Sequence, residues 1–174
     1  TPMRLGAKTY TRGIGVNSRS VLTVSLERPA AKFLADIGLD RNVDRTAASV
    51  TMHVSVDGKD ALATPVMRPD AAVRSIDVPL GGARSFDLVV GDGGDGRGWD
   101  QADWADARVK LQDGTEIWLD ALPVEGPVPF SFVYGGKPSA EFLRYWSRQV
   151  TDETVSSTVS RRTLTFRDPA TRLE

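Results

Sequence analysis

The 174-residue sequence contains no cysteine and only one histidine. The absence of cysteine excludes disulfides, thiolate nucleophiles and zinc sites built on cysteine. The single histidine, His53, has no second histidine or cysteine with which to bind a metal or activate a nucleophile, so we interpret it as a surface residue. No G-x-S-x-G element is present, which argues against serine hydrolase chemistry.

The sequence also lacks an excess of positive charge and long apolar runs. Its 22 Lys and Arg residues are balanced by 23 Asp and Glu residues, with no basic block, so nucleic acid is not an expected partner. Apolar runs are far shorter than the roughly 20 residues that cross a bilayer, so no membrane partner is expected either. Because no charged and then apolar segment follows Thr1, we expect a secreted or periplasmic protein whose signal peptide has been removed.

Composition changes at a proline-rich segment. Three prolines within residues 123–129 disfavour a helix and favour an extended linker. Aromatic residues become more frequent beyond it. The sequence therefore predicts a β-sandwich domain over residues 1–122, a linker over residues 123–128, and the opening segment of a second, incomplete β-sandwich domain over residues 129–174.

Hydrophobic residues upstream of the linker alternate with a period of two. Val50, Met52 and Val54 alternate with polar residues up to a turn at Asp57 and Gly58. Similar runs occupy residues 21–26, 33–37, 76–80, 86–90 and 107–119. Short strands at regular spacing without helical stripes predict an all-β antiparallel sandwich of the jelly-roll kind. The C-terminal extension is expected to add strands and one short helix beginning at Ser139.

A glycine-rich loop follows the strand over residues 86–90. Gly91, Gly93 and Gly96 satisfy the G-x-G-x-x-G spacing, but Asp92 and Asp95 would repel a pyrophosphate and no apolar helix follows. The aspartates of this loop also miss the spacing of an EF-hand. Standard nucleotide and calcium motifs are therefore absent here.

Residues 91–107, with the run Gly-Trp-Asp-Gln-Ala-Asp-Trp at 98–104, resemble the signature of the NPCBM domains, which are carbohydrate-binding module family 51. Residues 8–16, 37–40 and 50–59 agree in the same order. The resemblance implies a galactose-binding-domain-like β-sandwich, often containing calcium, that accompanies glycoside hydrolases. The family often has histidine where this chain has Asn17 and Gln101, and the joint replacement suggests that these two residues lie together at the ligand-facing edge. The alternative is that the two replacements mark an altered or lost sugar specificity.

The C-terminal segment carries a second resemblance. Residues 129–139, Trp146 and residues 164–166 resemble the start of the N-terminal β-sandwich of clan D α-galactosidases of the melibiase type. This implies an α-galactosidase-like parent enzyme whose catalytic domain is a partner of the module and is missing from this chain. No catalytic residue can be assigned within these 174 residues.

The candidate ligand-binding residues combine an aromatic ring with polar groups. Trp99 can stack on the apolar face of a sugar ring, and Asp100 and Gln101 beside it can take the sugar hydroxyls. Asn17 and Arg12 complete the predicted edge, and a galactose-containing glycan is the expected ligand. Packing is the alternative role for Trp99, whereas Trp104 and Trp118 are interpreted as packing residues.

A calcium ion is a second expectation. Asp40, Asn42 and Asp44 place oxygen atoms at alternate positions of one loop, which suits a hard cation. The alternative is a capped turn in which Asp40 bonds backbone amides.

A structural docking module with no sugar site is the rival function. A solvent-exposed Trp99 would favour sugar binding, and burial of its loop would favour docking.

Overall fold

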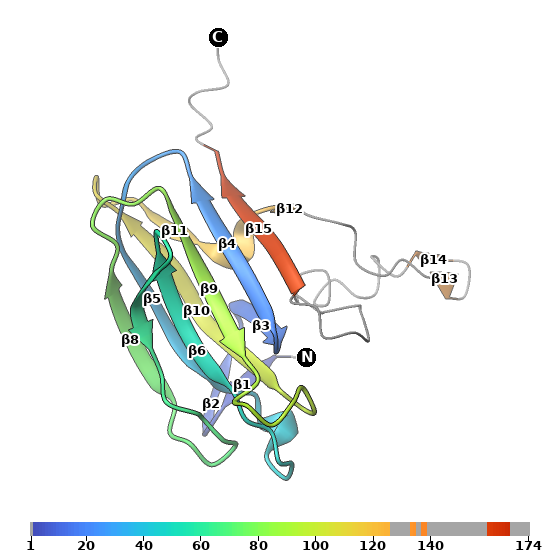
Figure 1. Cartoon of the computed structure of the whole chain (residues 1–174). Coiled ribbons are helices and arrows are strands. Elements are labelled where there is room, and N and C mark those ends of the chain that lie inside the picture. The colour runs from blue at the N-terminus through green and yellow to red at the C-terminus, as the bar shows by residue number, and fades with distance from the viewer. Residues whose placement is uncertain (1, 126–132, 135–136, 139–159, 168–174) are drawn as a thin grey trace.

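The alternating segments of the sequence form two β-sheets that pack face to face in a computed structural model of the chain (Figure 1). The structure describes residues 2–125, 133–134, 137–138 and 160–167. No helix within these ranges is long and apolar enough to cross a membrane.

The first sheet has five strands, in the order β11-β10-β5-β8, with β3 paired to β10 beside β11. Its strands are β3 (Gly13–Asn17), β5 (Ala30–Leu39), β8 (Arg74–Pro79), β10 (Gln101–Leu111) and β11 (Glu116–Trp118). Strand β10 is the centre of this sheet, since β5 lies along one side of it and β3 and β11 share the other.

The second sheet has six strands, in the order β12-β15-β4-β9-β6-β7. Its strands are β4 (Ser20–Leu26), β6 (Thr51–Val56), β7 (Lys59–Ala63), β9 (Ser85–Gly91), β12 (Val124–Glu125) and β15 (Ser160–Phe166). The pair β4 and β15 is parallel, and the other strand pairs of the described residues are antiparallel.

The smaller elements are two strand pairs and two single-turn 3-10 helices. They are β1 (Met3–Leu5) with β2 (Lys8–Tyr10), β13 (Val133–Tyr134) with β14 (Lys137–Pro138), η1 (Arg41–Val43) and η2 (Leu119–Ala121). The prediction of an all-β sandwich is confirmed. The helix expected from Ser139 lies outside the described residues.

Three aromatic rings meet in the core between the two sheets. The ring of Phe33 on β5 lies 5.5 Å from that of Phe86 on β9 and 6.0 Å from that of Trp104 on β10, measured between centroids. Trp104 is completely buried, which confirms its interpretation as a packing residue. Tilted and edge-on arrangements of this kind add to the free energy gained by burying the rings.

The described C-terminal strands join the first sandwich. Ser160–Phe166 belongs to the segment that the sequence assigned to a second domain, and it forms β15 beside β4 in the six-stranded sheet (Figure 1). Leu164 of this strand is 1% exposed and lies in the main hydrophobic core. Strand β12 comes from the predicted linker and pairs with β15. The first sandwich thus extends past residue 122, to strands that the sequence placed outside it.

Candidate functional site

An exposed tryptophan stands on the loop between β9 and β10. Trp99 is 65% exposed, and it and Val66 are the large hydrophobic residues exposed among the described residues. Its φ of 68° lies in the left-handed region, which residues other than glycine seldom adopt. The loop that holds this ring is attached to neighbouring segments of the sandwich by three aspartates.

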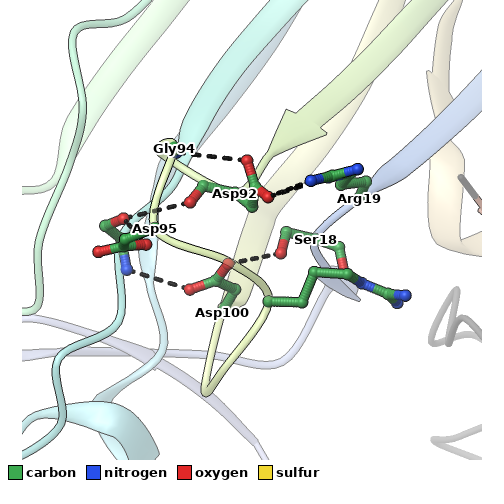
Figure 2. A network of polar contacts seen from close by, with 8 residues as sticks. Ser18, Arg19, Asp92, Gly94, Asp95 and Asp100 are labelled. Carbon is green, nitrogen blue, oxygen red and sulfur yellow. Dashed lines mark hydrogen bonds and ion pairs between the residues drawn. The ribbon is translucent and has the colours of Figure 1, made fainter. Parts of the chain in front are cut away.

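The first attachment joins the loop to the turn between β3 and β4. Asp92 accepts hydrogen bonds from Nε and Nη2 of Arg19 at 2.9 and 2.7 Å, and from the backbone N–H of Gly94 at 3.3 Å (Figure 2). The hydrogen bonds from Arg19 hold the pKa of Asp92 below its usual value. The carboxylate is therefore ionised at neutral pH and pairs with the guanidinium.

The second attachment joins the loop to the segment before β6. The hydroxyl of Ser49 lies 2.6 Å from Oδ1 of Asp95. Gly93 rests directly on Ser49 with a φ of 62°, and a Cβ at this position would overlap the serine side chain. Glycine at position 93 thus allows the loop to pack directly against the segment around Ser49, which is far from it in the sequence.

The third attachment is buried at the base of the loop. Asp100 is 1% exposed, accepts a hydrogen bond from the backbone N–H of Ser49 at 3.0 Å, and accepts another from the hydroxyl of Ser18 at 2.5 Å (Figure 2). Burial raises the pKa of this carboxyl despite the two hydrogen bonds. Both oxygens point into the protein, so the structure places Asp100 as an anchor of the loop rather than on its exposed side.

Two amide side chains lie beside the Trp99 loop. Asn17, the last residue of β3, is directly opposite Gln101, the first residue of β10, in the antiparallel pair. Directly paired residues point to the same face of a sheet, and both side chains are half-buried. Gln101 is also tied to the loop, because its N–H donates to the carbonyl of Trp99 at 2.7 Å. The sequence-based suggestion that Asn17 and Gln101 are neighbours matches this placement.

Arg97 is a site neighbour that sequence reasoning missed. Its Nε donates to the carbonyl of Ser18 at 2.9 Å, so its side chain crosses from the loop to the turn after Asn17. No local pattern marks this contact, since the two residues are joined only by folding. Its guanidinium adds a cationic donor beside the turn that follows Asn17.

Arg12 lies apart from this group. It precedes β3, whereas Asn17 ends the same strand, which separates their backbones by about 16 Å at the usual rise of a strand. Its Nη2 pairs with Oδ1 of Asp120 at 2.8 Å, and its guanidinium lies 4.2 Å from the ring centroid of Trp118. Arg108 covers the same ring at 5.3 Å. The structure therefore places Arg12 and Trp118 in a packing cluster and not beside Trp99.

The loop predicted to hold calcium is a capped turn. Asp40 caps η1, where its Oδ1 accepts the N–H of Asn42 at 2.9 Å and its Oδ2 accepts the N–H of Arg4 at 3.0 Å. Asp44 instead pairs with Nε of Arg41 at 3.0 Å. Alternate residues of a 3-10 helix, with about three residues per turn, point in diverging directions, so these side chains do not surround one point.

These contacts agree with the alternative of a capped turn. As placed, the side chains of Asp40, Asn42 and Asp44 do not fit a shared calcium ion. Within the described ranges, no group of three or more His, Cys, Asp or Glu residues is arranged to hold a metal. Binding of a structural calcium ion by the chain stays a prediction.

A buried carboxyl lies near Asp40, on the central strand β10 of the first sheet. Asp103 is 3% exposed, and its Oδ2 has no hydrogen-bond partner. Its neighbours on both sides in the sheet are glycines, Gly15 on β3 and Gly38 on β5. Burial, with the nearby Asp40 carboxyl, raises the pKa of Asp103 to about 9, so it is protonated at neutral pH. Asp103 was not among the predicted site residues.

A β-sandwich that presents an exposed tryptophan and two amides at one edge is built like a lectin-type binding module. The family model described as the NPCBM/NEW2 domain matches residues 1–110, and the chain belongs to this family. The resemblance drawn from residues 91–107 is thereby confirmed.

Similar proteins agree with this assignment. The putative endo-alpha-N-acetylgalactosaminidase of Renibacterium salmoninarum is 34% identical over 130 residues; the match covers 70% of this chain and 8% of that protein. The CBM51 module of Clostridium perfringens GH95, solved in complex with methyl-galactose, is 30% identical with a TM-score of 0.59, covering 63% of this chain and 79% of that one.

The CBM51-2 and INT domains of Clostridium perfringens ZmpB, solved with GlcNAc, are 32% identical with a TM-score of 0.59, covering 63% of this chain and 25% of that one. The structural neighbours are thus carbohydrate-binding modules. The chain itself spans only a small part of the curated relative.

Proposed function

We propose that the chain is a non-catalytic carbohydrate-binding module of a glycoside hydrolase, and that it binds a galactose-containing glycan at the edge formed by Trp99, Asn17 and Gln101. The observation that carries the proposal is the 65% exposure of Trp99 on an anchored loop. An exposed aromatic ring on an anchored loop offers an apolar face on which a sugar ring can stack. Its three anchors keep it presented without a bound sugar, which reduces the ordering cost of binding.

The chemistry of this edge suits a neutral pyranose. The indole offers a flat apolar face for the C–H side of the sugar, and the amides of Asn17 and Gln101 offer both donors and acceptors for its hydroxyls. Asp92 is satisfied by Arg19, and Asp100 is buried, so the charges of the loop are used within the protein. The methyl-galactose and GlcNAc complexes of the neighbours support a hexose ligand.

The parent enzyme is a further part of the proposal. The name of the curated relative supports a glycoside hydrolase. An α-galactosidase of the melibiase type is the finer proposal, and it rests on the resemblance of the C-terminal segment. A secreted or periplasmic location is the corresponding expectation, and the catalytic domain of the parent is the expected partner.

Docking without sugar binding is the alternative function. It requires the Trp99 loop to be covered, and in the described part of the chain the indole faces solvent. An exposed indole is the outcome that the sequence analysis linked to sugar binding.

Isothermal titration tests the proposal. Wild type is expected to bind methyl-galactoside, and Trp99→Ala to bind at least tenfold more weakly, which corresponds to about 1.4 kcal/mol. Val66→Ala is the matched control, because Val66 is also an exposed hydrophobic residue at 45%. Equal affinity in wild type and Trp99→Ala would refute the site. The chain alone is expected to release no nitrophenol from a nitrophenyl galactoside.

A further inference from the structure

Strand β15 belongs to the second sheet but lies outside the segment that the family model matches. The family model ends at residue 110, whereas β15 begins at residue 160. Strand β4 pairs with β9 on one side and with β15 on the other. Without β15, one side of β4 would present its backbone N–H and C=O groups as an open sheet edge, which is a template for another strand.

The backbone of β15 follows the edge of β4 along its full length. The parallel register runs from Ser160 opposite Ser20 to Phe166 opposite Leu26. Figure 1 shows the two strands side by side. The carbonyl of Phe166 also accepts the N–H of Glu27 at 3.3 Å. On its other side, among the described residues, β15 pairs with the two residues of β12, and the N–H of Thr165 donates to the carbonyl of Pro123 at 3.4 Å. The attachment of β15 is therefore mostly to β4.

One side chain anchors β15 in the core. Leu164 is 1% exposed and lies opposite the completely buried Val24. Phe166 is partly buried, with the guanidinium of Arg28 5.5 Å from its ring centroid. Arg161 is exposed, and Thr163 and Thr165 are half-buried. A backbone ladder with one deep apolar anchor is how an added peptide strand binds a sheet edge.

The edge occupied by β15 borders the anchors of the Trp99 loop. Strand β4 begins at Ser20, directly after Ser18 and Arg19. These two residues hold Asp100 and Asp92 of the loop. A strand that fixes the start of β4 therefore also fixes the segment on which the loop is anchored.

We propose that the edge of β4 is an acceptor site for an added strand, called the groove below, and that Ser160–Phe166 occupies it. This strand, called the clasp, docks as a separable segment onto a sandwich whose other strands are already assembled. Docking of the clasp holds the start of β4 and, through Ser18 and Arg19, the Trp99 loop. The groove itself does not depend on sugar binding; only the effect on the loop rests on the proposed function.

Hydrogen exchange of the full chain tests the groove. In Leu164→Asp, a charge replaces the buried anchor, and the amides of β4 that face β15 are expected to exchange at least tenfold faster. The amides of β5 and β10 should keep their wild-type rates. Arg161→Asp is the matched control on the same strand and should behave as wild type. Unchanged exchange in β4, or a loss of protection that spreads to β5 and β10, would overturn the proposal.

A synthetic peptide with the sequence of residues 160–167 tests whether the strand is separable. Added in excess to Leu164→Asp, it is expected to restore the protection of β4, because the groove is vacant. The same peptide with aspartate at the position of Leu164 should restore nothing. Failure of the unmodified peptide, or equal action of both peptides, would contradict a separable clasp.

Titration of the same variant with sugar distinguishes failure of this proposal from failure of the proposed function. Leu164→Asp is expected to bind methyl-galactoside at least threefold more weakly than wild type, with recovery on addition of the peptide. If wild type binds no sugar, the proposed function fails while the exchange data still decide the groove. Sugar affinity that does not change while β4 loses protection would overturn the link to the loop alone.

Discussion

Asn17 and Gln101 lie directly opposite each other where β3 ends and β10 begins, and the N–H of Gln101 is bonded to the carbonyl of the exposed Trp99. The strand pair places the two amides, and the bond from the N–H of Gln101 ties the adjoining loop, which carries the indole, to the same edge. Strands hold side chains more rigidly than loops do, so this arrangement does not need a ligand to form.

Substituting either amide with alanine should weaken sugar binding. A net hydrogen bond contributes about 0.5 to 1.5 kcal/mol, so Asn17→Ala and Gln101→Ala are each expected to reduce the affinity for methyl-galactoside by roughly 2- to 12-fold. The melting temperature should change little, because both side chains are half-buried. Arg12→Ala is the control, since Arg12 lies at the other end of β3. A loss of affinity in Arg12→Ala with none in the amide variants would contradict the placement of the site.

Removing the buried anchor of the loop should cost stability. Asp100→Ala leaves the N–H of Ser49 and the hydroxyl of Ser18 without their acceptor. An unsatisfied buried polar group costs about 1 to 3 kcal/mol, and the free energy of unfolding is expected to fall by about that amount. Urea titration measures the change. A variant as stable as wild type would show that Asp100 does not hold the loop.

Two glycines of the same loop should respond differently to alanine. In Gly93→Ala the new methyl group overlaps Ser49 and the φ of 62° is strained, so the loop must move. Gly98 has open space around its Cβ position. We expect Gly93→Ala to lower both the melting temperature and the sugar affinity, and Gly98→Ala to resemble wild type. Similar behaviour of the two variants would argue against the Ser49 contact.

The buried carboxyl of Asp103 should make stability depend on pH. Its pKa is raised in the folded protein from the usual 3.8 to about 9, so the folded state holds a proton that the unfolded state releases. Its contribution is complete below pH 4 and is lost as the pH rises toward 9. One unit of pKa corresponds to about 1.4 kcal/mol, so the loss between pH 5 and pH 8 should exceed that figure.

Asp103→Asn provides the comparison for this titration. The neutral amide can still donate to Asp40 but cannot ionise, so the fall in stability between pH 5 and pH 8 should be smaller in this variant. Unfolding by urea at both pH values measures the difference. Parallel pH profiles of the two proteins would show that Asp103 is ionised in the fold.

The sequence predicted those strands whose two faces differ. Val50, Met52 and Val54 face the core and alternate with polar residues, and the turn at Asp57 and Gly58 follows as expected. The beginning of β10 was less evident. Ala102, Asp103, Trp104 and Ala105 are all buried, because the β1 and β2 pair covers part of the outer face, and a strand buried on both faces shows no alternation.

Long-range contacts could not be predicted from local patterns. The packing of Leu164 beside Val24 joins residues 140 positions apart, and nothing in the sequence near either one specifies the other. The same holds for Ser49 beneath the Trp99 loop and for Asp40 near Asp103. The pairing of Asn17 with Gln101 was suggested because the family resemblance linked the two positions, whereas Arg12 was included for its predicted loop placement and its chemistry.

The most direct test is a titration followed by the indole N–H signals in a nitrogen-proton NMR spectrum. The chain has four tryptophans, and Trp99→Phe assigns the signal of Trp99. With methyl-galactoside, the Trp99 signal should shift saturably while that of the buried Trp104 stays fixed. A spectrum in which the Trp99 signal does not respond up to saturating sugar, or in which only the Trp118 signal moves, would contradict a sugar site at this edge.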